Sequence, residues 1–212
     1  MRGLDAAVIG GRLASLESAR EHLVKRGREI SRLARRLSSY TLLGLTDDAS
    51  RVFGELADAY RSVAGELSRY PELLYSNLFY SVTAEYVEAV QLYSVVFGEG
   101  IRGPDELGVH PVPYVLGLLD LVGELKRVSL ESLRRGDYQK SFEYLDIAER
   151  VYETLSELSA ADAVVPGFRR KLDIYRKVID DWRALLIDVE SRLRLERACK
   201  SASWLQQRDE SA

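Results

Sequence analysis

Several residue types are scarce in this chain, and each scarcity excludes a class of chemistry. The single cysteine, Cys199, excludes an internal disulfide. The two histidines, His22 and His110, lie in no Glu-x-x-His motif, which excludes the di-iron carboxylate bundles that need such pairs on facing helices. No Gly-x-Ser-x-Gly motif is present and Cys199 has no nearby histidine, so nucleophilic catalysis has no support. The GEGIRG stretch at 98–103 has neither the length nor the lysine of a P-loop.

The N-terminus has no basic segment followed by an apolar run, and with one cysteine this predicts a reducing, intracellular setting, which we take to be cytoplasmic. The least polar stretch, 73–98, contains two glutamates and several hydroxyl and amide side chains. It is therefore predicted to be a buried core helix, and no membrane contact is expected. The net charge of −3 does not by itself indicate a nucleic-acid partner, so the distribution of charge matters more.

The patterning predicts an all-α fold. Hydrophobic residues make up 46% of the chain, strand signals are nearly absent, and all five prolines fall between periodic segments. We expect one helical domain over residues 1–197 and a polar, disordered tail over 198–212. Six or seven helices are expected, at about 4–38, 46–70, 71–97, 113–135, 138–159 and 166–197, with one turn at 105–107.

Two of the most apolar predicted helices each carry a pair of acids. In EYVEAV, residues 85–90, Glu85 and Glu88 are three apart and share one helix face. In PVPYVLGLLDLVG, residues 111–123, the only charge is Asp120, and Glu124 follows one turn later. Both pairs are thus predicted to point into the core.

A buried carboxylate without a partner is costly, and two close together force one to take up a proton. The cost is offset by an Arg or Lys partner, by protonation, or by a divalent cation. Mg²⁺, or Mn²⁺ in its place, suits three or four clustered acids and would assist phosphodiester hydrolysis. The residue pattern alone leaves this interpretation open beside one in which the acids serve packing or an interface.

A basic face is predicted on the first helix. KRGREISRLARR, residues 25–36, has six basic residues against Glu29, and most of them fall on an arc away from the apolar face. Such a stripe suits a phosphate backbone, whereas the plainer alternative is a solvated face balanced by nearby acids. The candidate nucleic-acid-binding residues are Arg20, Lys25, Arg28, Arg32, Arg35 and Arg36.

Three stretches together resemble the translin family, and within it the nuclease-bearing branch of translin-associated factor X. They are EYVEAV at 85–90, PVPYVLGLLDLVGELKRVSLESLRRGDY at 111–138 and RRKLDIYRKVIDDWRALLIDVESRL at 169–193. The first helix, with AREHLVKRGREISRLARRL, is similar to the basic first helix of the family. The connection at 98–110 is much shorter than the corresponding loop of animal factor X, which favours a self-assembling form.

The resemblance implies a translin-like bundle that assembles into a closed homo-oligomer, an octamer, and an endoribonuclease that cuts single-stranded RNA with Mg²⁺. It assigns the catalytic and metal-binding roles to Glu85, Glu88 and Asp120, with Glu124 on the adjoining acid position. The competing expectation is a non-catalytic scaffold that binds single-stranded RNA or DNA. A purely architectural helical oligomer is a third alternative.

Overall fold

The computed structural model describes residues 5–158 and 161–209, and its regular structure there is entirely helical. This confirms the all-α prediction. Six long helices build the bundle, and three helices of a single turn lie between them. The long helices are α1 (Ala6–Leu43), α2 (Thr46–Leu67), α4 (Asn77–Val96), α6 (Pro111–Arg134), α7 (Tyr138–Ser156) and α9 (Phe168–Asp209); the short ones are α3 (Pro71–Leu74), α5 (Pro104–Leu107) and α8 (Ala161–Val164).

The helix predicted over 71–97 is in fact two helices, α3 and α4. Ser76 separates them, because its extended backbone ends the first turn and its hydroxyl accepts a hydrogen bond from the N–H of Phe79 at 3.3 Å. A serine in this position is a favourable N-cap and starts a new helix. The predicted turn at 105–107 is confirmed as α5.

The last helix does not end near Arg197 as predicted. α9 continues to Asp209, so the expected disordered tail is wrong over this range. Residues 198–209 contain no proline or glycine to stop the helix, and Lys200 pairs with Glu196 one turn earlier.

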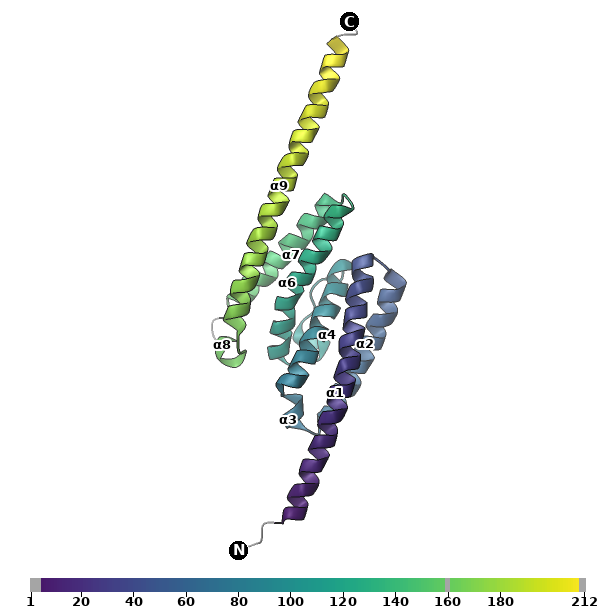
Figure 1. The fold of residues 1–212 in the computed structure, drawn as a ribbon, viewed down its shortest axis with the longest axis vertical. Coiled ribbons are helices and arrows are strands. Elements are labelled where there is room, and N and C mark those ends of the chain that lie inside the picture. Colours follow the sequence, from purple (N-terminus) through teal and green to yellow (C-terminus); the bar gives the residue numbers. More distant parts are fainter. Residues whose placement is uncertain (1–4, 159–160, 210–212) are drawn as a thin grey trace.

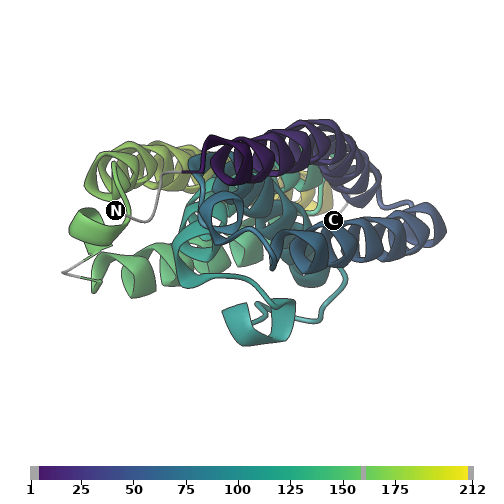
Figure 2. The same ribbon diagram turned by 90° about the horizontal axis from the view of Figure 1, so that it is seen from below.

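The helices are arranged around α4 and α6. α1, α4, α6 and α7 pack side by side in that order, with α2 against α1 and α4, and α9 against α6 and α7 (Figure 1). The N-terminal end of α1 and the C-terminal half of α9 project beyond the bundle at opposite ends. Seen along the bundle, α5 and its flanking loops stand to one side of the long helices (Figure 2). No helix within the described ranges combines the length and apolarity needed to cross a lipid bilayer.

Two glycines let α4 approach its neighbours closely. A Cβ at Gly27 of α1 would lie 2.9 Å from Cγ2 of Val82. A Cβ at Gly117 of α6 would lie 2.7 Å from both the Ala84 carbonyl oxygen and Cβ of Val87. These separations are too short for any side chain, so α6 crosses α4 almost backbone to backbone. Asp120 follows Gly117 by about one helical turn and is therefore held near the acids of α4.

The connection between α4 and α6 is fixed by a buried amide. Gln91 is fully buried, and its side chain donates to the carbonyl of Arg102 at 2.6 Å and accepts from the N–H of Arg102 at 2.9 Å. The hydroxyl of Tyr114 donates to the same carbonyl at 2.8 Å. These bonds tie the loop to both helices and fix where α6 begins.

Substituting Gly117 tests the close crossing. We expect Gly117→Ala to lower the free energy of unfolding by roughly 1–3 kcal/mol, because the added methyl group overlaps a backbone carbonyl that cannot move independently. Gly123→Ala on the same helix is the matched control, since its Cβ would lie an ordinary 3.7 Å from the Tyr175 ring. Chemical denaturation of both variants measures the difference; equal effects would show that the crossing tolerates a side chain.

Candidate active site

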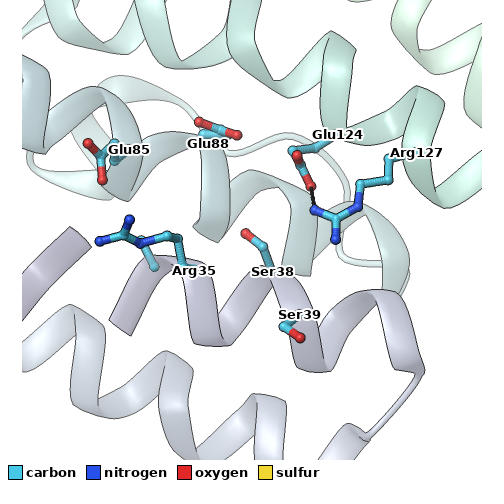
Figure 3. Close-up of a pocket in the computed structure, with 8 residues that line it drawn as sticks. Arg35, Ser38, Ser39, Glu85, Glu88, Glu124 and Arg127 are labelled. Atoms are coloured by element: carbon cyan, nitrogen blue, oxygen red, sulfur yellow. Dashed lines mark hydrogen bonds and ion pairs between the residues drawn. The ribbon is translucent and has the colours of Figure 1, made fainter. Parts of the chain in front are cut away.

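The two predicted acid pairs meet where α4 and α6 pack together, at two adjoining cavities. Glu85 and Glu88 come from α4, and Asp120 and Glu124 come from α6. Three of them, all but Asp120, line a cavity of about 510 Å³ whose opposite wall is α1. Figure 3 shows Glu88 and Glu124 on the helices that face α1, with Arg35 and Ser38 of α1 on the other side.

A second cavity lies beside the first. It has a volume of about 620 Å³ and is lined by Glu85, Asp120 and Lys171, together with Tyr80 of α4. Glu85 belongs to the walls of both cavities. The four predicted acids are therefore brought together around two adjoining cavities.

Asp120 is held by two side chains of α9. Lys171 Nζ donates to its two carboxylate oxygens at 2.7 and 2.8 Å, and the hydroxyl of Tyr175 donates to Oδ1 at 2.9 Å. Burial, followed by the charge of Asp120 itself, raises the pKa of Tyr175, so this phenol stays protonated and remains a donor. Part of the negative charge on α6 is thus neutralised from within the protein.

The negative charges of the other three acids are less well neutralised by basic side chains. Glu124 is 22% exposed and pairs with Arg127 at 3.4 Å, one turn further along α6. No ion pair links Glu85 or Glu88 to a basic side chain within the described ranges.

The surroundings of Glu88 oppose its ionisation. Burial raises its pKa to about 7, and the charges of Asp120, Glu124 and Glu85 act in the same direction, while Lys171 acts against them. An elevated carboxyl pKa in a cavity is typical of functional sites, although structural clusters produce it too.

The chemistry of these residues fits a hard divalent cation, since such ions prefer several carboxylate oxygens and water. The side-chain arrangement differs from that of a bound site: among the residues that the structure describes, no three Asp, Glu, His or Cys groups lie where they could hold a metal ion together. Asp120 is turned to Lys171 and Glu124 to Arg127. Metal binding therefore remains a prediction that requires these side chains to exchange partners.

The predicted basic face of α1 is present. Arg20, Lys25, Arg28 and Arg32 are exposed, and none forms an ion pair with a described acid. Arg35 is exposed as well and lines the first cavity, where it lies near Glu85 (Figure 3). Arg36 is half-buried and sits over the Tyr40 ring at 5.9 Å.

The arginines of this basic face differ from other arginines of the protein in their ion pairing. Arg51, Arg61 and Arg134 each pair with an acid three or four residues away on their own helix. Within residues 25–36, Arg26 with Glu29 is the one ion pair between described residues, and nucleic-acid binding by this face stays a prediction.

Two side chains near the acids are not predicted by the sequence motifs. Lys171 and Tyr175 are four apart and share a face of α9, which is a visible signal. Their partner Asp120 lies more than fifty residues earlier, so only the tertiary packing reveals the contact. Tyr86 and Tyr93, the tyrosines near the acids of α4, do not present a face for base stacking because both are buried: Tyr86 stacks on Tyr60, and Tyr93 on Phe53.

These observations define a helical protein with an acid-lined cavity beside a basic helix, and comparison with known proteins narrows the class. Residues 96–181 match the Translin family. An uncharacterized protein of Methanocaldococcus jannaschii is 28% identical over 190 residues, which are 89% of this chain and 84% of that protein. Translin-associated protein X of Pongo abelii is 41% identical over 54 residues, which are 26% of this chain and 19% of that protein.

Solved structures are similar to this chain over nearly its whole length. The complex of AfC3PO with duplex RNA matches with a TM-score of 0.80 and 27% identity, covering 87% of this chain and 96% of that one. Apo-NeC3PO matches with a TM-score of 0.79 and 25% identity, covering 88% and 98%. The fold is thus the all-α fold of these C3PO structures.

The elevated pKa of Glu88 predicts a pH-dependent stability in the absence of metal. The pKa is about 7 in the folded protein and near 4.5 without the fold, so the folded state binds this proton more tightly. The resulting stabilisation is present below about pH 4.5 and is lost as the pH rises through about 7. We expect Glu88→Gln to be more stable than the wild type at about pH 8, by at most about 3 kcal/mol, with the difference shrinking toward about pH 5.

Denaturation in EDTA across this pH range measures the effect. Glu17→Gln is the control, because Glu17 is exposed on α1 and has no ion pair with a described residue. Its profile should run parallel to the wild type. A parallel profile for Glu88→Gln as well would contradict the buried, crowded environment assigned to Glu88.

Proposed function

We propose that this chain is a translin-type protein of the factor X branch and acts as a Mg²⁺-dependent endoribonuclease on single-stranded RNA in the cytoplasm. The observation that carries the proposal is the meeting of four acids from α4 and α6 at two adjoining cavities, the first of which is bordered by the basic helix α1. The family match over 96–181 and the whole-chain likeness to an RNA-bound C3PO structure support RNA as the ligand. The local match to translin-associated protein X supports the branch.

Glu85, Glu88, Asp120 and Glu124 are the residues that would hold the ion. A bound Mg²⁺, or Mn²⁺, would supply a polarised water and neutralise charge on a phosphate oxygen. Lys171 pairs with Asp120 and Arg127 pairs with Glu124 in this structure, and both carboxylates would have to exchange these partners for the ion.

The basic helix positions the strand. Arg28 and Arg32 offer guanidinium groups that have no acidic partner among the described residues, and Arg35 reaches the wall of the acid cavity. Arginine binds phosphate oxygens in a fork geometry, so a strand lying along α1 would bring its phosphates to the acids.

We further propose that the protein forms a closed homo-oligomer, an octamer. Large apolar side chains remain exposed on both projecting helix ends, including Leu13 of α1 at 61% and Leu195 of α9 at 66%. Surfaces of this kind on a single chain favour contact between copies.

The alternative is a scaffold that binds single-stranded RNA or DNA without cutting it. The ion pair of Asp120 with Lys171 favours this alternative, because an internal ammonium group already neutralises one of the acids needed for a metal.

Cleavage of labelled single-stranded RNA separates the two functions. We expect cleavage with Mg²⁺, none with EDTA, and a loss of at least about 100-fold in Glu88→Gln, because ligand geometry and charge both change. Fluorescence anisotropy should show that Glu88→Gln still binds RNA, and Glu17→Gln serves as control for both readouts. Binding without cleavage in Mg²⁺ and Mn²⁺ would establish the scaffold, and cleavage that survives Glu88→Gln would remove the acids from the reaction.

The basic helix predicts a salt-dependent affinity. Arg28→Ala/Arg32→Ala should weaken RNA binding and reduce the slope of log affinity against log salt by about 1.4, since each lost contact to a single strand removes about 0.7. Arg61→Ala/Arg192→Ala is the matched control, because it removes the same charge from exposed residues already paired on their own helices. Equal changes in the two double variants would show a general charge effect rather than a binding face.

A further inference from the structure

A third cavity lies next to the acid site and is lined mainly by aromatic rings. It has a volume of about 230 Å³ and sits between α2, α3, α4 and the start of α6. Tyr75, Tyr80 and His110 form its outer wall, with Tyr60 and Phe79 deeper in the core. The proposed function does not use this cavity.

The three outer rings are held in a defined arrangement. His110 stacks on Tyr80 with ring centroids 5.4 Å apart and an interplanar angle of 15°, and it meets the edge of Tyr75 at 5.6 Å. His110 is also the N-cap of α6: its Nδ1 accepts from the N–H of Val112 at 3.3 Å. The hydroxyl of Tyr80 lies 3.2 Å from the same nitrogen.

These hydrogen bonds to Nδ1 select one of the two tautomers of the neutral His110 ring. Because Nδ1 accepts from a backbone N–H, the proton lies on Nε2, and Nε2 has no partner among the described residues. Tyr75 is 57% exposed although it is a large aromatic side chain. An exposed ring face and a free N–H donor thus stand beside each other at the mouth of a cavity.

The location connects this cavity to the acid site. Tyr80 lines both the aromatic cavity and the second cavity, where Glu85, Asp120 and Lys171 lie. Glu85 in turn lines the first cavity with Arg35. The three cavities are therefore consecutive neighbours, with Glu85 common to the first and second and Tyr80 common to the second and third.

We propose that Tyr75, Tyr80 and His110 form a binding site for one unpaired nucleobase of the RNA strand whose phosphates lie at the acids. The inference rests on the proposed function and deepens it. The base stacks on the exposed face of Tyr75, and the Nε2–H of His110 donates to a base nitrogen or carbonyl oxygen. Aromatic rings stack on any unpaired base, whereas a base within a duplex is already stacked and paired. This site thereby gives the protein its preference for single strands.

Equilibrium binding in EDTA tests the site without cleavage. The probes are a single-stranded RNA with 2-aminopurine at successive positions and a duplex of the same sequence. We expect Tyr75→Leu to weaken single-strand binding roughly 5- to 100-fold, to remove the stacking quench at one position, and to leave duplex binding unchanged. Tyr75→Phe should restore both readouts, because it keeps the ring.

Tyr138→Leu is the control, since Tyr138 is an exposed tyrosine at the start of α7, away from the cavity. If the wild type binds the single strand and Tyr75→Leu binds it equally well, the base site is overturned and the proposed function is not. Equal weakening of single-strand and duplex binding would also overturn it. A wild-type protein that binds neither RNA would overturn the proposed function as well.

Discussion

The close crossing of α4 and α6 at Gly117 is the constraint on which the candidate site depends. A side chain there would overlap the Ala84 carbonyl, so the two apolar helices meet almost backbone to backbone. Side chains one turn along from such a crossing are forced near one another. Asp120, one turn from Gly117, and Glu124, two turns from it, are thereby set against Glu85 and Glu88. Gly27 lets α1 approach α4 closely and close the first cavity from the other side.

Charge is distributed unevenly around this crossing. Lys171 offsets Asp120 and Arg127 offsets Glu124, whereas the pKa of Glu88 is raised to about 7 because burial and its acidic neighbours oppose ionisation. The guanidinium groups of Arg28 and Arg32 lack acidic partners on α1. Partly buried acids without a basic partner weaken the isolated fold, and local departures of this kind are expected at functional sites. A cation among the acids would relieve this cost, and phosphates along α1 would pair with its guanidinium groups.

The amino-acid sequence is sufficient where the signal is local. Apolar periodicity predicts the long helices, and an isolated charge in an apolar segment is enough to mark Glu85, Glu88 and Asp120 as unusual. The sequence alone does not predict contacts between distant segments. Lys171 and Tyr175 reach Asp120 only because α9 packs on α6. The grouping of Tyr75, Tyr80 and His110 likewise depends on where α3 and α6 begin. The break at Ser76 escapes prediction because apolar periodicity outweighs one capping residue.

The central claim is that the acids of α4 and α6 share one divalent ion. Anomalous diffraction from crystals soaked in Mn²⁺ tests this most directly, because manganese is located without reference to activity. The account predicts a manganese peak between Glu85, Glu88 and Asp120, with Asp120 turned away from Lys171. Crystals that take up manganese elsewhere, or not at all, while Asp120 keeps its bonds to Lys171 and Tyr175, would contradict it.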